Sequence, residues 1–355
     1  MKAGTVRPAM MAGAARAETL SGRAARRPAG AGQHFGWMLV AILVLLGLAG
    51  LAAGSEGWSF AWSGETQLLW WIRAPRTLGA LLAGALLGLA GAVSQGLFRN
   101  PLADPYLLGS AAGAGFGIVL VLSAGGLAGG VLTNTTADQL AQTGLVAAAF
   151  AGALAGVGLT LILARGASRP LVLLLAGVVV GVVLAALSDL LMLVSPQAMR
   201  SRYVFLLGTT GFLGWKEAGV LALTLALALP LALMFARALD ALVLGEHGAT
   251  SLGVPLPQVR LLLVGVIALC TGSAVAQTGL IAFVGLVAPH LVRRCVRVAH
   301  GPLLLLSTLM GGVLLLAADV AARSLVAPAE LPVGVLTAVF GGAYLLLLLR
   351  RRVPQ

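Results

Sequence analysis

The stretch PRTLGALLAGALLGLAGAVSQGL, residues 75–97, decides the fold class because it is apolar over the length of a membrane span. No charged residue follows Arg76 before the stretch ends at Leu97. A helix needs about 20 mostly apolar residues to cross the hydrocarbon core, where every backbone polar group must be satisfied inside the segment. The stretch is therefore predicted to be a transmembrane helix.

The rest of the chain has the same character. Of its 355 residues, 59% are apolar and only 10% are charged, which excludes an ordinary soluble domain. We predict an all-α polytopic membrane protein with about ten spans, the one at 280–292 tilted or of half length. The predicted spans are residues 37–53, 77–97, 106–124, 144–164, 171–194, 218–236, 259–276, 280–292, 303–322 and 333–349.

The basic residues predict the orientation. Most of the 23 Arg and Lys residues fall on the side that holds both termini, so this side is expected to be cytoplasmic. Residues 1–35 are rich in Arg and Ala and are expected to form a disordered cytoplasmic tail, with the transmembrane domain at 36–355. The same bias explains the net charge of +12 without nucleic-acid binding.

A second stretch echoes the first. VRLLLVGVIALCTGSAVAQTGL, residues 259–280, places Arg260 against Arg76 and Gln277 against Gln95. The predicted topology runs the two copies in opposite directions, which makes a weak inverted internal repeat of the kind found in alternating-access transporters. A chance match between two short apolar stretches is the alternative. Glycines at every fourth position, as in Gly84 and Gly88, are expected to be helix-packing faces.

Five polar motifs interrupt the spans: RAPR (73–76), RNPLADPYLLGSAAGAG (99–115), LGEHGATSLGV (244–254), GLIAFVGLVAPHLVRR (279–294) and ELPVGVLTAVFGG (330–342). In this order and spacing they resemble the FecCD family, the membrane permease subunits of ABC importers for iron–siderophore, haem and cobalamin. The resemblance covers residues 70–349. One departure is Ala343, which stands where the family usually has a proline.

The resemblance implies an importer permease of the bacterial cytoplasmic (inner) membrane, which carries an iron chelate or cobalamin by alternating access. The implied partners are a second permease subunit, identical or a paralogue, two cytoplasmic ABC ATPase subunits and an extracytoplasmic substrate-binding protein. ATP and Mg would bind the ATPase, and this chain would need no cofactor. The residues agree, because neither Lys2 nor Lys216 belongs to a GxxxxGK[ST] phosphate loop and the chain is not expected to be an enzyme.

In the family, the loop matching residues 239–254 forms short coupling helices that fit a groove on the ATPase. Here its apolar residues offer a compact docking surface, its charged residues a polar rim and its glycines sharp turns. A solvated connector is the alternative, and it predicts fewer apolar residues. The implied coupling residues are Asp240, Leu242, Leu244, Gly245, Glu246, Ala249, Leu252 and Gly253.

The resemblance also implies that Arg73, Arg76 and Arg323 on the outer face pair with glutamates of the binding protein. Contact with lipid headgroups is the alternative. Exposed ion pairs are individually weak, so steering and register would be their main contribution. The motifs and the repeat supply candidates for the pathway or gate, which are Gln95, Asn100, Pro101, Gly109, Gln277, Gly285 and Pro289.

Two carboxylates keep another class open. Asp189 and Asp319 lie in or at the outer ends of spans, where an ionisable residue could relay protons or bind a cation. An ion-coupled secondary transporter is therefore the alternative function, although a helix-end ion pair with Arg323 is the favoured interpretation of Asp319. An intramembrane serine protease at LLGSAAGAG lacks a partner histidine. Cys270 and Cys295 have no metal-ligand spacing, so no metal site is predicted.

Overall fold

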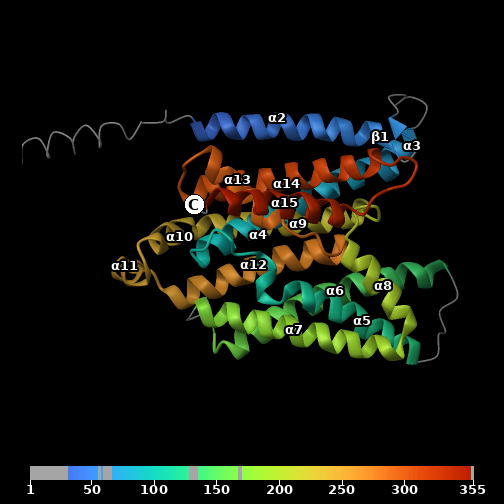
Figure 1. Cartoon of the computed structure of the whole chain (residues 1–355), viewed down its shortest axis with the longest axis horizontal. Helices are drawn as coiled ribbons and strands as arrows, with labels where there is room; N and C mark the ends of the chain where they lie inside the picture. The colour runs from blue at the N-terminus through green and yellow to red at the C-terminus, as the bar shows by residue number, and fades with distance from the viewer. Residues whose placement is uncertain (1–30, 55–56, 59–65, 128–134, 167–169, 353–355) are drawn as a thin grey trace, which may run out of the picture.

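The computed structural model describes residues 31–54, 57–58, 66–127, 135–166 and 170–352. This part of the chain is a bundle of helices lying roughly along one axis (Figure 1). Its strands, β1 (Ala53–Gly54) and β2 (Gly57–Trp58), pair antiparallel in one small hairpin. The all-α prediction is confirmed.

The long helices follow the predicted spans. Seven helices of the described residues are long and apolar enough to cross a membrane, and α5 and α15 contain shorter apolar stretches. The protein is therefore a multi-pass membrane protein. The membrane-length and half-length helices are α2 (Ala31–Ala52), α4 (Ala74–Leu97), α5 (Ser110–Leu127), α6 (Thr135–Leu163), α7 (Pro170–Val194), α9 (Trp215–Met234), α12 (Leu256–Thr278), α13 (Val284–Cys295), α14 (His300–Ser324) and α15 (Val333–Arg352).

Short helices gather at the two ends of the bundle. In Figure 1, α10 (Ala236–Val243) and α11 (Glu246–Ser251) lie at one end, where α2 also starts and α15 ends. We call this the α10–α11 end. The opposite end, which we call the α8 end, holds α8 (Pro196–Leu207), the β hairpin, α3 (Thr66–Leu68) and the π-helix η1 (Leu69–Arg73). The start of α2 at Ala31, the end of α15 at Arg352 and the loop at 239–254 therefore lie at the same end of the described bundle.

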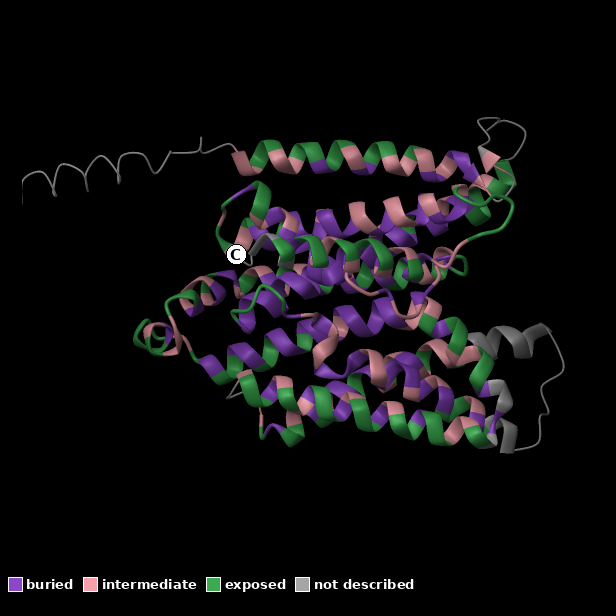
Figure 2. Cartoon of the chain, in the orientation of Figure 1, coloured by how far each residue is buried: buried purple, intermediate pink, exposed green. Residues whose placement is uncertain are grey.

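Helix α4, which carries the opening stretch, lies in the centre. It packs against α9, α12, α13 and α14, and 89% of its apolar window is buried. Figure 2 shows the buried residues concentrated on these central helices, whereas α2 and α7 expose much of their length. A helix that is apolar all round belongs in such a core.

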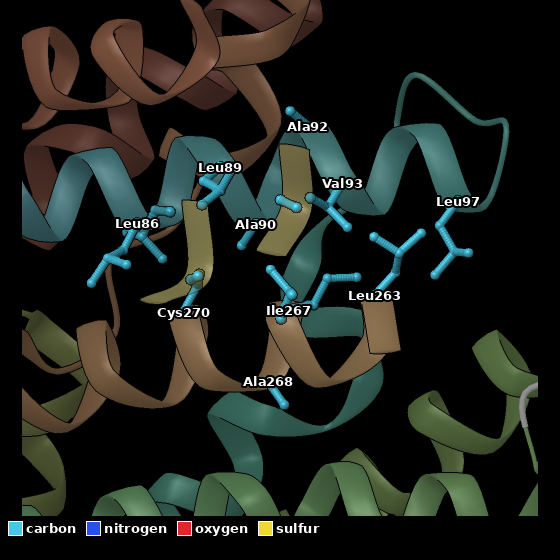
Figure 3. Close-up of a cluster of buried hydrophobic side chains, with 14 of the residues drawn as sticks. Leu86, Leu89, Ala90, Ala92, Val93, Leu97, Leu263, Ile267, Ala268 and Cys270 are labelled. Atoms are coloured by element: carbon cyan, nitrogen blue, oxygen red, sulfur yellow. The ribbon is translucent and has the colours of Figure 1, made fainter. Parts of the chain in front are cut away.

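Helices α4 and α12 pack antiparallel, as the inverted repeat requires. Figure 3 shows their apolar side chains pointing toward one another across the contact, and these belong to the main buried cluster of the protein. The facing residues are Leu86, Ala90 and Val93 on α4 and Leu263, Ile267 and Cys270 on α12.

The glycine faces pack as predicted. A methyl group on Gly84 would collide with the carbonyl oxygen of Gly311 on α14, and one on Gly113 would collide with that of Gly152 on α6. Lipid tails solvate leucine as well as another helix does, so close backbone approach is what holds such helices together. These glycines therefore fix the α4–α14 and α5–α6 contacts.

Several predicted boundaries were wrong. Helix α2 begins at Ala31, so residues 31–35 belong to a helix and not to the tail; residues 1–30 lie outside the described part. Tyr106 lies in a 3-10 turn, η2 (Pro105–Leu108), and α5 starts only after Gly109 adopts a left-handed conformation. Helix α13 begins at Val284, and α8 was not predicted. Helix α15 continues through Ala343.

Candidate functional site

The loop at 239–254 folds into two short helices, α10 and α11. Helix α10 buries Ala236, Leu239 and Leu242, which are spaced three apart and so share one face. Gly245, at φ +93°, allows the sharp turn into α11, and Gly253, at φ +79°, follows its end. We call residues 236–252 the α10–α11 hairpin.

The hairpin presents apolar side chains outward. Leu244 is 69% exposed, and Val243 and Leu252 are similarly open. Leu242 and Ala249, which were predicted to contribute to the docking surface, are instead buried at 1% and 0% exposure. The prediction was wrong for these two because they point toward the bundle, where they anchor the hairpin.

Two carboxylates tie the hairpin to the bundle. Asp240 on α10 accepts hydrogen bonds from the backbone N–H of His300, at 3.0 Å, and pairs with its Nδ1, at 2.7 Å. Glu246 on α11 pairs with Arg260 on α12 at 2.8 Å and lies 4.0 Å from Arg99. The charged rim predicted from the sequence therefore points at the membrane helices, and each half of the hairpin is fixed to a different one.

At the α8 end, the three arginines predicted to dock a binding protein line one pocket. The pocket has a volume of about 170 Å³ and also includes Glu330 and residues of β1 and η1. Arg76 and Arg323 are buried, and Arg73 donates to the carbonyl oxygen of Leu51 at 3.3 Å. The structure thus brings the three residues together and buries all of them, Arg73 included.

Asp319 organises this pocket. Its carboxylate, which is completely buried, pairs with Arg76 at 3.2 Å and with Arg323 one helical turn away, and it accepts a hydrogen bond from Thr210. Arg76 also reaches Glu330 at 2.9 Å. The predicted ion pair of Asp319 with Arg323 is confirmed, and Arg76 and Thr210 are partners that the sequence did not indicate.

Asp189 lies in a different environment. Its side chain is 65% exposed and pairs with Arg202 of α8 at 2.6 Å. An exposed pair and a carboxylate already held by two arginines do not form a cation relay between them. Among the described residues, no cluster of three or more His, Cys, Asp or Glu side chains could hold a metal. Asp189 and Asp319 are therefore both engaged in ion pairs with arginines of this chain.

Two breaks in the helical core meet near the centre of the bundle. The segment after α4 leads into η2, and the segment after α12, residues 279–283, is also irregular. The Tyr106 hydroxyl donates to the carbonyl of Ile281 at 3.2 Å, and a methyl group on Gly285 would lie 2.8 Å from Pro105. Broken helices at equivalent places of an inverted repeat are typical of transporter binding pathways.

The gate candidates lie around these breaks and at the α10–α11 end. Gln95 is buried, where its amide donates to the carbonyl of Leu286 at 3.0 Å and its oxygen accepts from Arg293. Gln277 is half-buried at the end of α12. Gly109, Gly285 and Pro289 are buried, whereas Asn100 and Pro101 are exposed. Their gating role stays a prediction.

Sequence reasoning missed Arg260, His300 and Arg293 as contact residues of the site. Arg260 had a signal, because the internal repeat set it against Arg76, and both arginines are buried near the start of their helices. His300 and Arg293 had none, since their partners lie 60 and 198 residues away.

A further apolar cavity of about 350 Å³ lies between α13, α14 and α15.

Comparison with known proteins gives consistent results. Residues 37–351 match the FecCD transport family. The chain is 39% identical over 331 residues to the hemin transport system permease protein HmuU of Yersinia pestis, covering 90% of this chain and 96% of the relative. It is 38% identical over 331 residues to the vitamin B12 import system permease protein BtuC of Escherichia coli O9:H4, covering 90% and 97%.

A solved structure is also similar. It is an inward-facing conformation of a metal-chelate type ABC transporter, to which the chain aligns with a TM-score of 0.80 and 28% identity, over 90% of this chain and 99% of the other. The similarity in sequence and in structure spans nearly the whole length of each protein. The common features are therefore those of the complete membrane domain.

Proposed function

The chain belongs to the FecCD transport family, and we propose that it is the transmembrane permease subunit of an ATP-binding-cassette importer. The α10–α11 hairpin carries this proposal. It exposes Val243, Leu244 and Leu252 at one end of the bundle, on a base fixed by the Glu246–Arg260 ion pair and by the contacts of Asp240 with His300. Exposed apolar side chains on a rigid support are what a protein docking surface requires.

The partner at this surface would be a cytoplasmic ABC ATPase, two copies of which bind ATP and Mg. The permease itself has no phosphate-binding loop, so hydrolysis must take place on that separate subunit. ATP binding and hydrolysis would shift the hairpin and alternate the pathway between outward and inward openings. The α10–α11 end and both termini would then lie in the cytoplasm, and the membrane would be the bacterial inner membrane.

The pathway would form around the two helix breaks and be completed by a second permease subunit, identical or paralogous. Irregular backbone at membrane depth is stable only where protein buries it or where it lines a cavity. Here the Leu280 N–H donates to the Phe205 carbonyl and the Ile281 carbonyl accepts from Tyr106, so the break is held by protein contacts on this side. Gln95, Gly109, Gln277 and Gly285 are the proposed pathway residues nearest to it.

The cargo would be a metal chelate. The relatives with 39% and 38% identity are a hemin permease and a vitamin B12 permease, so identity does not choose between haem and cobalamin, and an iron–siderophore belongs to the same class. These cargoes share a bulky body around one metal. Selectivity would come largely from the separate binding protein that delivers the chelate.

That binding protein would dock at the α8 end. Arg73, Arg76 and Arg323 line the 170 Å³ pocket against one lining carboxylate, Glu330, so the pocket favours an acidic side chain from outside. Steering by this cationic pocket would weaken as salt increases.

Co-purification tests the proposal. The chain would be expressed with an ABC ATPase subunit from the same genome, as wild type and with Leu244→Asp. We expect the wild type to hold the ATPase and the variant to lose it, because the new charge lies in the apolar contact. Leu102→Asp is the matched control: it is also an exposed leucine at the α10–α11 end, outside the hairpin, and should keep the complex. Equal binding by wild type and Leu244→Asp would refute the proposal.

A further inference from the structure

Helix α14 reaches both docking regions of the protein. Its first residue, His300, contacts α10, and its last turn carries Arg323, which lines the arginine pocket. At 1.5 Å per residue, its 25 residues span about 37 Å, the thickness of a membrane core with part of both interfaces. One continuous element therefore joins the two ends.

The joint at the α10–α11 end is tight. Asp240 binds both the backbone N–H and the ring of His300, so the carboxylate fixes the position of the helix start as well as its side chain. A methyl group on Gly96 would meet the His300 ring at 3.1 Å and Leu239 at 3.2 Å. The end of α4, the buried face of α10 and the start of α14 thus meet at one place.

The joint at the α8 end is an ion network. Asp319 on α14 binds Arg76 at the start of α4, and Arg323 donates to the carbonyl oxygens of Gly50, at 2.9 Å, and Ala53, at 3.3 Å. These contacts connect the last turns of α14 to α4, α2 and β1. A displacement of this part of α14 must therefore move the arginines that line the pocket.

The middle of α14 leaves no room for sliding. Gly311 packs on Gly84 and Gly88 of α4 so closely that no Cβ fits at any of the three positions. The proline of α14, Pro302, lies in its first turn, where it interrupts no helical hydrogen bond. Small residues at backbone contact make α4 and α14 behave as one rigid pair.

We propose that α14, paired with α4, transmits the movement of the α10–α11 hairpin to the arginine pocket at the opposite end. Asp240 and His300 are positioning residues in this transmission, because they couple the hairpin to the helix. The inference rests on the proposed function, since the movement starts at the ATPase. Coupling must be reciprocal, so a ligand in the arginine pocket also changes the energetics of the hairpin.

The test places a fluorophore at the far end of α14. A Cys295→Ser, Ala329→Cys chain carries an environment-sensitive maleimide label on the exposed turn beside Glu330, while buried Cys270 stays unlabelled. In the complex with its ATPase, ATP with vanadate should change the fluorescence. In His300→Ala we expect the amplitude to fall about five-fold or more, with the ATPase still bound. His300→Gln keeps a donor and should give an intermediate amplitude.

Arg297→Gln is the matched control, since it removes an exposed charge three residues before His300 and should keep the full amplitude. A second measurement uses the chain alone: hydrogen exchange in α10 should rise in His300→Ala, and rise further in Asp240→Ala, because only the Asp240 variant also removes the bond to the backbone N–H of His300. The double variant should match Asp240→Ala. Full amplitude in His300→Ala, with the joint shown to be broken by exchange, would overturn the inference. Failure of the wild type to bind the ATPase would instead refute the proposed function, and the transmission with it.

Discussion

The two ends of the molecule use charge in opposite ways. At the α10–α11 end, the carboxylates of Asp240 and Glu246 are partly exposed, and each ties a short helix to one side chain of the bundle, His300 for Asp240 and Arg260 for Glu246. At the α8 end, Asp319 is completely buried and holds two arginines at once. The α10–α11 end is a hairpin that is held by these two contacts and points its apolar side chains outward. The α8 end is a rigid cationic pocket. The α10–α11 end therefore presents an apolar contact surface, whereas the α8 end presents a positive electrostatic potential.

The largest expected effect is at Asp319. Changing it to Ala leaves Arg76 and Arg323 close together and buried, and breaking a buried ion pair from one side costs about 3–5 kcal/mol. We expect a strong loss of thermal stability in detergent, measured by tryptophan fluorescence or by aggregation. A variant as stable as the wild type would show that the buried network contributes little, and the contrast between the two ends would fail.

Packing between α4 and α14 comes next. Gly84→Leu would drive a side chain into the backbone of Gly311, and overpacking of this kind costs about 1–3 kcal/mol. The thermal midpoint should fall clearly. Gly265→Leu on α12 is the control, because no atom lies within 4 Å of a Cβ placed there. Similar falls in the thermal midpoint of both variants would mean that close packing of α4 on α14 contributes no extra stability.

At the α10–α11 end, Glu246→Gln removes the partner of Arg260, whose side chain is 4% exposed. Because Glu246 itself is partly solvated, we expect a cost of about 1 kcal/mol, confined to the hairpin. Hydrogen exchange of α11 should accelerate while the exchange of α14 stays unchanged. Acceleration throughout the bundle would contradict the separation of the hairpin from the core.

The smallest effect should be at Asp189. Its pair with Arg202 is exposed, and exposed pairs contribute about 0–1 kcal/mol. Asp189→Asn should leave both stability and transport close to wild type. A collapse of transport in this variant, at unchanged stability, would revive the ion-coupled alternative and give Asp189 the central role.

The sequence predicted what depends on local pattern. Runs of about 20 apolar residues predicted the spans, and glycines four apart predicted the packing faces. The order of the spans predicted that α4 and α12 run in opposite directions. Within the loop at 239–254, the pattern predicted a docking surface but assigned both Leu242 and Leu244 to it. These residues lie two apart on a helical turn, so one faces the bundle and the other faces outward.

What could not be predicted depends on contacts between distant parts of the chain. Asp319 and Arg323 are one helical turn apart, and their pair was expected, but Arg76 lies 243 residues from Asp319. The contact between Asp240 and His300 could not be predicted for the same reason, because the two residues lie 60 positions apart in the sequence. Boundaries were lost where backbone geometry overrides hydropathy, as at Gly109, whose left-handed conformation separates η2 from α5. Helix α8 carries two arginines and so lacked the apolar signal of a span.

Uptake into proteoliposomes tests the central claim most directly. Vesicles holding the chain with its ATPase and binding protein would be given labelled hemin or cyanocobalamin, with and without ATP inside the ATPase-facing compartment, and with and without a protonophore. The account predicts uptake of a chelate that needs ATP, survives the protonophore and is lost in Leu244→Asp. Uptake that continues without ATP and collapses with the protonophore would contradict it.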